Sequence, residues 1–244
     1  MDFTVKRYQA LIVALKESGV DFDLRHDVDK MPKNSLRIAQ LEFSLGVKAT
    51  YYFRAVDESW DESIIKEIAS MGHRIGYHYE SLTTCNGDVE LAYRDFCTNL
   101  ERLRKLVPVD AICMHGSPRS KYDSRDLWKH YDYHALGINH ESYLDTDFSK
   151  VLYLTDTGRR WDGYKVSVRD KIPEYQEQWD NEGLSFHTTD DIIQALYGQA
   201  IGYYHLLITT HPQRWNPMGW QWIKEFILQS IKNPIKRLLF VRNN

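Results

Sequence analysis

The stretch Leu24-Arg25-His26-Asp27-Val28-Asp29 carries an apolar run into a charged cluster that ends in two carboxylates. Successive side chains of a strand alternate between its faces, so we expect Arg25, Asp27 and Asp29 on one face and His26 on the other. Two acids held close together repel each other, and folded proteins tolerate them mainly where a metal ion or a catalytic role compensates. The stretch therefore predicts a strand that brings two functional carboxylates to one place.

Several further apolar runs have the character of strands, and several of them have a His or Asp at or near their end. They cover residues 51–54, 74–80, 111–116, 151–156 and 205–212. Between them, apolar residues recur at three- and four-residue spacing, which is typical of helices, over residues 4–18, 34–45, 63–70, 89–106 and 190–200. Strands that alternate with helices predict a parallel sheet, and in closed barrels of that kind functional residues lie at the C-terminal strand ends. We therefore predict an α/β fold, a distorted parallel (β/α) barrel of about seven strands.

Length and composition fit a single enzyme-sized unit. The 244 residues contain no linker-like tract, so we expect one domain over residues 1–244. A formal net charge of −3 argues against nucleic acid as a partner, and no run of about 18 apolar residues predicts a membrane span. The N-terminus lacks the pattern of a signal peptide, and Cys85, Cys97 and Cys113 share no metal-ligand spacing. These features predict a cytoplasmic protein with reduced cysteines and leave its oligomeric state open.

Three potential metal ligands follow three different predicted strands. Asp29, His78 and His115 could converge on one point above the barrel. An Asp/His/His set suits zinc, with iron, cobalt or nickel as alternatives, and leaves positions open for water and substrate. A lone histidine at a strand end is more often simply hydrogen-bonded, but an acid pair beside two such histidines, with a third at His211, favours a metal centre. Glu80, two residues after His78, is an alternative ligand.

With these residues assembled, the chain resembles the polysaccharide deacetylase superfamily, the NodB-homology domains of carbohydrate esterase family four. In that family, one Asp of the first motif is the catalytic base and the next binds a divalent metal, and Asp27 and Asp29 match an Asp-x-Asp form of it. The second motif has a Gly-His-x-Ile-Gly lead-in followed by two metal-binding histidines four residues apart. Residues 72–78 match this lead-in and the first ligand, His78. The fifth motif, a histidine on the last strand, has a counterpart in residues 207–211.

The chain departs from the family pattern at two places. Leu82 stands four residues after His78, where the family has its second histidine, and leucine cannot coordinate a metal. The third motif, normally built around Arg-x-Pro-Tyr, is replaced by Met114-His115-Gly116-Ser117-Pro118. A histidine lost at one strand end and present at the next predicts that His115 is a relocated ligand. The fourth motif has a counterpart in Asp156 and Trp161.

The resemblance also implies a role for each site residue. The metal would activate a water molecule and polarise an acyl carbonyl, Asp27 would accept the proton of that water, and His211 would protonate the departing amine. Arg25, Arg159 or Arg160 could hold Asp27 ionised. The alternative is that Asp27 serves only as the buried partner of one of these arginines.

Aromatic residues near the expected site fit a ligand the size of a sugar. We expect five aromatic residues to flank the site, namely Tyr77, Tyr79, Trp161, Trp215 and Trp220, with Trp215 as a pocket wall. Trp222 and Phe226 are expected on the buried face of the last helix.

Three functions are compatible with these residues. The first is a metal-dependent hydrolase that removes an N-acyl group, such as acetyl, from a sugar or a related small amide. The second is a cyclic amide or imide hydrolase of the same superfamily. The third is a catalytically silent barrel that binds a glycan or a partner protein. The presence of Asp27, Asp29 and His211 together favours an enzyme, because a binding module gains nothing from keeping base, ligand and acid.

Overall fold

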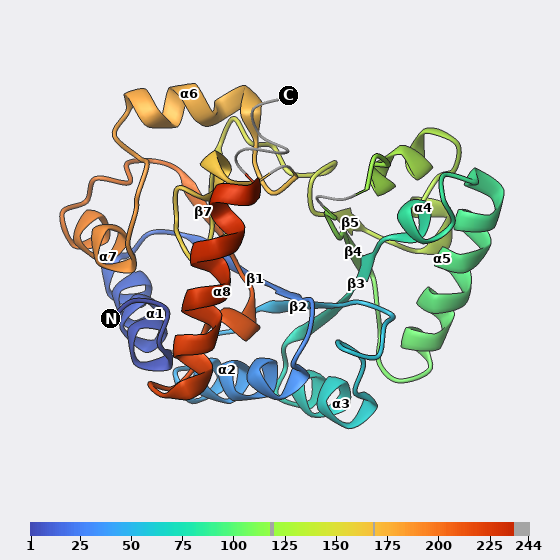
Figure 1. Ribbon diagram of the computed structural model, residues 1–244, viewed down its shortest axis with the longest axis horizontal. Coiled ribbons are helices and arrows are strands. Elements are labelled where there is room, and N and C mark those ends of the chain that lie inside the picture. The colour runs from blue at the N-terminus through green and yellow to red at the C-terminus, as the bar shows by residue number, and fades with distance from the viewer. Residues whose placement is uncertain (118–119, 168, 237–244) are drawn as a thin grey trace.

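The computed structural model describes residues 1–117, 120–167 and 169–236, so Pro118 of the altered third motif lies outside the described residues. Figure 1 shows the arrangement of its elements. The strands are β1 (Phe22–Val28), β2 (Thr50–Phe53), β3 (Arg74–Tyr79), β4 (Ala111–Met114), β5 (His140–Glu141), β6 (Val151–Thr155) and β7 (His205–Thr210). The α-helices are α1 (Val5–Ser18), α2 (Pro32–Ser44), α3 (Glu62–Ser70), α4 (Ser81–Thr84), α5 (Val89–Arg104), α6 (Pro173–Asn181), α7 (Thr189–Tyr197) and α8 (Trp220–Lys236). The short 3₁₀ helices are η1 (Ser124–Lys129), η2 (His134–Leu136), η3 (Gly163–Lys165) and η4 (Pro212–Arg214).

The seven strands form one parallel sheet in the order β5-β4-β3-β2-β1-β7-β6. The sheet curls, with helices around its outside (Figure 1). Among the described residues no pairing joins β5 to β6, so the barrel stays open between these two strands. The predicted fold, a distorted parallel (β/α) barrel of about seven strands, is confirmed.

The helices cover the sheet with the apolar faces that their sequences predicted. On α3, Ile64, Ile65 and Ile68 are buried, and Asp61 caps the helix by accepting hydrogen bonds from the first turn. On α1, Thr4 caps the N-terminus, and the chain leaves the helix through Gly19 at φ 72°, a conformation that favours glycine. No helix in the described part of the chain is long and apolar enough to cross a membrane.

Strand β1 separates two sets of buried polar groups, as the alternation of its side chains predicted. On one face, His26 bonds to Glu42 at 2.8 Å and to Thr210 at 2.7 Å. Glu42 also accepts hydrogen bonds from the hydroxyls of Tyr8 and Tyr51. On the other face, Arg25 and Asp27 point toward the site that is described below. The buried side chains on the face with His26 therefore hydrogen-bond to one another and have a structural role.

This network links stability to pH through Glu42. Burial raises the pKa of this carboxyl, but His26 and the two tyrosine hydroxyls outweigh burial and hold its pKa below the usual value. Such a carboxylate stabilises the fold above its unfolded pKa, and the contribution is lost as the pH falls. We expect Glu42→Gln to lower the free energy of unfolding by about 1.5–3 kcal/mol at pH 7, and the deficit to shrink toward acid pH. Denaturant unfolding of the wild type and the variant from neutral to acid pH measures this difference in the free energy of unfolding. Glu101→Gln, at an exposed residue, is the control. A deficit that is constant with pH would contradict the linkage.

Two parts of the fold differ from the sequence-based expectation. The sequence did not predict β5 and α6, because a two-residue strand shows no alternation and α6 buries only Trp179. The expectation that Trp222 and Phe226 form the buried face of α8 is wrong, because Phe226 is 51% exposed and Trp222 is only half-buried. Among the side chains of this helix that the structure describes, Glu225 and Gln229 are the buried ones.

Candidate metal centre

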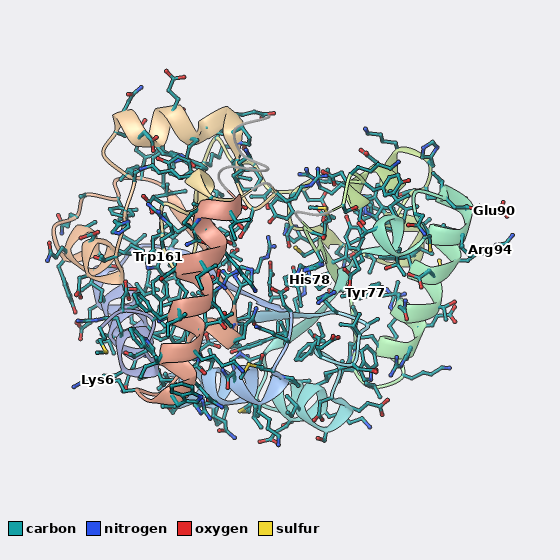
Figure 2. The ribbon with its side chains drawn as sticks, in the orientation of Figure 1. Lys6, Tyr77, His78, Glu90, Arg94 and Trp161 are labelled. Atoms are coloured by element: carbon teal, nitrogen blue, oxygen red, sulfur yellow. The ribbon has the colours of Figure 1, made fainter. Side chains whose placement is uncertain are left out.

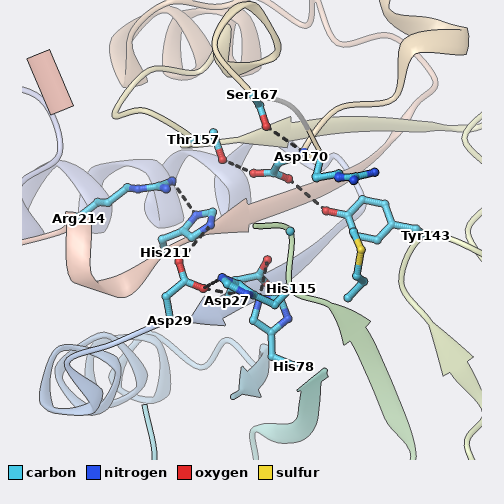
Figure 3. A pocket seen from close by; sticks show the side chains of 13 residues that line it. Asp27, Asp29, His78, His115, Tyr143, Thr157, Ser167, Asp170, His211 and Arg214 are labelled. Carbon is cyan, nitrogen blue, oxygen red and sulfur yellow. Dashed lines mark hydrogen bonds and ion pairs between the residues drawn. The ribbon is translucent and has the colours of Figure 1, made fainter. Parts of the chain in front are cut away.

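The parallel strands bring three predicted ligands to one point. Asp29 follows β1, His78 is near the end of β3 and His115 follows β4, so all three lie at the C-terminal edge of the sheet. The Nε2 atoms of His78 and His115 lie 3.6 Å and 3.5 Å from Oδ1 of Asp29. One ligand atom from each residue lies within 4.8 Å of the others, which makes the set a geometric candidate for a metal site (Figure 3).

The donor atoms of this set fit a divalent metal. Oδ1 of Asp29 is buried and has no hydrogen-bond partner among the described residues. Its distances to the two Nε2 atoms are too long for hydrogen bonds. They are close to the separation of about 3.4 Å that two ligands have when each lies about 2.1 Å from a tetrahedral zinc ion. Burial raises the pKa of Asp29, but the surrounding histidines hold it well below its usual range, so the group is anionic as a ligand must be.

Both histidines are oriented through their other ring nitrogen. Nδ1 of His78 lies 2.9 Å from the carbonyl oxygen of Cys113, and Nδ1 of His115 lies 2.9 Å from Oε2 of Glu80. A proton on each Nδ1 leaves a lone pair on each Nε2, on the side where Oδ1 of Asp29 lies, so that a metal ion there could be bound by all three atoms. A carboxylate or carbonyl behind a histidine is the usual support of a histidine ligand. The structure therefore places Glu80 behind His115 and outside the ligand set, which corrects its interpretation as an alternative ligand.

Arg54 holds Glu80 in this position. Its Nε and Nη2 donate to Oε1 of Glu80 at 2.9 and 2.6 Å, and its Nη1 donates to the main-chain oxygen of Asp29 at 3.2 Å. Burial raises the pKa of Glu80, but His115 and Arg54 lower it to about 2. Arg54 stands directly after β2, so its position at a strand end could have pointed to it in the sequence.

Glu80→Gln tests this support. An amide oxygen is a weaker acceptor for the Nδ1 proton of His115 than a carboxylate and raises the basicity of the ring less, and loss of such a partner typically lowers metal affinity about 10–100-fold. We expect a decrease of that size in zinc affinity, measured by competition with a chromogenic chelator. Glu90→Gln on the exposed surface of α5 is the matched control and should bind as the wild type does. Unchanged zinc affinity in Glu80→Gln would show that His115 needs no such partner.

A second set of potential ligands, Asp27, His78 and Cys113, shares His78 with the first. Both oxygens of Asp27 already accept hydrogen bonds from Arg25, at 2.8 and 2.7 Å. Burial raises the pKa of the Cys113 thiol well above its usual value, which disfavours the thiolate that a metal needs. The first set, Asp29, His78 and His115, is therefore the better candidate for a metal site, and we call it the metal set or ligand set.

Asp27 lies beside the metal set in a buried ion pair. The two-pronged contact with Arg25 holds it, and Oδ2 lies 3.8 Å from Nε2 of His78. Burial raises the pKa of Asp27, but Arg25 and then His78 lower it to about 2, so the carboxylate is ionised at neutral pH. Of the three arginines considered from the sequence, the structure pairs Arg25 with Asp27.

His211 lies on the other side of Asp29. Its Nε2 is 3.9 Å from Oδ2 of Asp29, and its Nδ1 lies 2.6 Å from Oδ1 of Asp156. Burial and Arg214 lower the pKa of His211, yet Asp156 and Asp29 outweigh them and raise it above the usual value. Nη1 of Arg214 also donates to Oδ1 of Asp156, at 2.7 Å. The site thus places an ionised carboxylate, Asp27, beside His78, and a histidine with a raised pKa, His211, beside Asp29 (Figure 3).

A pocket of about 180 Å³ opens above these groups. Hydroxyl-bearing side chains from segments that the sequence did not single out line it, among them Tyr143, Thr157 and Ser167, together with Asp170. Asp170 accepts hydrogen bonds from Tyr143 at 3.2 Å and from Thr157 (Figure 3). These residues follow the short strand β5 or lie in the segment after β6, so no strand-end pattern marked them.

Four residues expected at the site lie elsewhere. Arg159 donates to the carbonyl oxygen of Trp222 on α8, and Arg160 pairs with Asp162, so neither supports Asp27. Trp161 is buried, bonds to Thr189 and lies well apart from His78 in Figure 2. Trp215 is completely buried and donates to Oδ2 of Asp156 at 2.7 Å. It is therefore a support beneath His211, and its interpretation as a pocket wall is wrong.

Leu82, which stands four residues after His78, is part of the hydrophobic core. It lies on the short helix α4, where it is 4% exposed and packs in the hydrophobic core. The residue four positions after His78 thus contributes to the core, while Nε2 of His115 lies 3.5 Å from Oδ1 of Asp29.

No family model and no curated protein matches the chain. Among solved structures, a mutant of a CE4 family pseudoenzyme from Bacillus anthracis is similar at 11% identity and a TM-score of 0.41, over 88% of this chain and 63% of that one. The chain thus spans less than two thirds of that protein's length. The Xyl-CE4 domain of a multidomain xylanase from the hindgut metagenome of Trinervitermes trinervoides is similar at 14% identity and 0.41, over 78% and 87%. A mutant of the peptidoglycan deacetylase PdaC from Bacillus subtilis is similar at 9% and 0.40, over 90% and 97%. The chain is therefore similar to CE4 family structures at low identity, and its chemistry has to be inferred from its own side chains.

Proposed function

We propose that this protein is a metal-dependent hydrolase that removes an N-acyl group, such as acetyl, from a sugar or a related small amide. The observation that carries the proposal is the convergence of Asp29, His78 and His115, with Asp27 next to His78 and His211 next to Asp29. A ligand set alone would suit a structural metal, but a flanking base and acid at a pocket suit hydrolysis. Zinc fits the donor set, and iron, cobalt or nickel are alternatives.

Asp27 is proposed as the general base. A divalent ion held by the three ligands supplies Lewis-acid activation of water and of the acyl carbonyl. Asp27 accepts the proton of the attacking water, because Arg25 keeps its carboxylate ionised and in one orientation. Each oxygen of Asp27 has a further lone pair that Arg25 does not use, and this lone pair can accept a hydrogen bond from the attacking water.

His211 is proposed as the general acid. Its Nδ1 is engaged by Asp156, so the proton that it delivers is the one on Nε2, the atom nearest Asp29. Asp156 and Asp29 raise the pKa of His211 above its usual value, which favours the protonated form that expulsion of an amine requires. Arg214 and Trp215 fix Asp156, and through it the ring of His211.

The pocket suits a small, polar substrate. The hydroxyls of Tyr143, Thr157 and Ser167 can bond to the hydroxyl groups of a sugar, and the volume of about 180 Å³ limits how much of a substrate the pocket encloses. We further propose that the protein acts in the cytoplasm, since its three cysteines are all unpaired.

Metal content and acetate release together test this function. Protein purified without added metal or chelator is expected to contain about one ion per chain, and to release acetate from members of a panel of N-acetylated sugars. Removal of the ion by a chelator should stop the release, and zinc should restore it. Ring opening of cyclic imides, measured with the same protein, tests the second candidate activity, that of a cyclic amide or imide hydrolase. Protein that holds stoichiometric metal and hydrolyses neither class would contradict the proposal and favour a silent binding barrel.

A further inference from the structure

Helix α8 has its polar side turned inward and its apolar side turned outward. Glu225, Gln229 and Asn233 follow one another at four-residue spacing, and Glu225 and Gln229 are buried. The opposite side carries a stripe of five large apolar residues with exposed fractions between 42% and 75%, namely Trp220, Ile223, Ile227, Ile231 and Ile235. Their spacing of three and four residues places them on one face of the helix. We call this stripe the outer face of α8.

Polar contacts on the inner side fix the orientation of the helix. Asn233 donates to the main-chain oxygen of Gly158 at 2.8 Å, and the carbonyl of Trp222 accepts from Arg159 at 3.0 Å. The indole of Trp222 donates to the main-chain oxygen of Asp2 at 2.8 Å. Figure 1 shows α8 across the front of the molecule, with one side toward solvent. An apolar face of this length on a helix held by polar contacts marks an interaction surface.

The exposed charges that α8 itself carries are basic. Lys224 and Lys232 are exposed on α8, whereas its only acid, Glu225, is buried on the inner side. In the sequence, the helix is followed by Arg237, the apolar run 238–241 and Arg242. A second copy of this chain on the same face would bring like charges together. Apolar residues that include a tryptophan, flanked by bases, instead suit an anionic lipid surface.

A groove beside the start of α8 extends this surface. It has a volume of about 740 Å³, and its lining includes the apolar residues Met1, Val5, Pro217 and Met218 and the bases Lys6 and Arg37. The third base of the lining, Arg7, is paired with Asp190, and no acid lines the groove in the described part of the chain. The groove therefore has the same chemistry as the outer face, apolar with a basic margin.

We propose that the outer face of α8 docks the protein on anionic lipid bilayers, with the helix lying in the plane of the interface. The docking is independent of the proposed hydrolase activity, because the residues of the outer face belong to neither the metal set nor its pocket.

Vesicle flotation tests the proposal. The purified protein is expected to float with phosphatidylcholine vesicles that contain phosphatidylglycerol, and much less with phosphatidylcholine alone. The double variant Ile227→Asp/Ile231→Asp should lower the partition by at least about tenfold, since it places charge in the acyl region. Lys224→Gln and Lys232→Gln should each lower it about fivefold and reduce its sensitivity to salt. Leu91→Asp, at a residue of α5 that is 52% exposed, is the matched control and should float as the wild type does.

Two results would overturn the proposal. One is a wild-type protein that floats with neither vesicle, or equally with both and without dependence on salt. The other is a dimer by light scattering that the Ile227→Asp/Ile231→Asp variant converts to a monomer, which would assign the face to a second copy. The far-ultraviolet circular dichroism spectrum should match that of the wild type in every variant, which reports folding independently of both membrane binding and the proposed metal.

Discussion

Asp27→Asn is expected to lower the turnover number by about 10²–10⁴-fold, the usual contribution of a general base. The metal content should stay close to that of the wild type, because both oxygens of Asp27 are engaged by Arg25 and the ligand set does not need them. The asparagine side chain is nearly isosteric but cannot accept a proton. Steady-state acetate release and metal analysis of the same preparation measure the two effects.

Asp29→Asn provides the contrast, because it lies only two residues away and has the opposite role. It removes the anionic ligand whose Oδ1 faces both histidines, so metal occupancy should fall first and activity with it. Excess zinc should then restore part of the activity of Asp29→Asn and none of that of Asp27→Asn. If Asp27→Asn loses the metal while Asp29→Asn keeps both metal and activity, the two roles are reversed.

His115→Ala is expected to lose at least about 10²-fold in zinc affinity. The change removes one of three protein ligands, which exceeds the loss of about 10–100-fold that follows removal of a supporting residue alone. The binding deficit should therefore be larger than that of Glu80→Gln, and the double variant should be no worse than His115→Ala, because Glu80 acts through this ring. Competition with a chelator measures all three proteins.

His130→Ala is the matched control for His115→Ala, since His130 is exposed and belongs to neither set of potential ligands. It should bind zinc as the wild type does. If His115→Ala keeps wild-type affinity while Glu80→Ala abolishes binding, Glu80 is the ligand and the relocation of the second histidine to position 115 is wrong.

Local periodicity accounts for what could be predicted about the site. The alternation along residues 24–29 separated Arg25 and Asp27 from His26, because side chains on a strand have a period of two whatever surrounds them. The C-terminal ends of parallel strands share one edge of the sheet, so polar residues at the ends of β1, β3, β4 and β7 had to gather there. Both arguments use only neighbouring residues and the direction of the chain.

Pairing between distant side chains could not be predicted in this way. Glu80 is as close to His78 in sequence as Asp29 is to Asp27, yet the structure turns it toward His115 and Arg54. Trp215 looked like a pocket wall, but it is buried beneath Asp156, which is 59 residues away in the chain. Arg159 and Arg160 were as plausible as Arg25 until their partners were known. No pattern in the sequence distinguishes one buried partner from another at such separations.

The sequence by itself thus determined the strand–helix alternation, the edge of the sheet that carries the site, and the ligand types Asp, His and His. Only the tertiary structure decided which ring nitrogen each histidine directs at Asp29, which arginine holds Asp27, and which face of α8 is turned to solvent. The physical reason is range: hydrophobic periodicity acts over a few residues, whereas hydrogen bonds and ion pairs depend on angstrom-scale distances that exist only when distant strands and loops have packed.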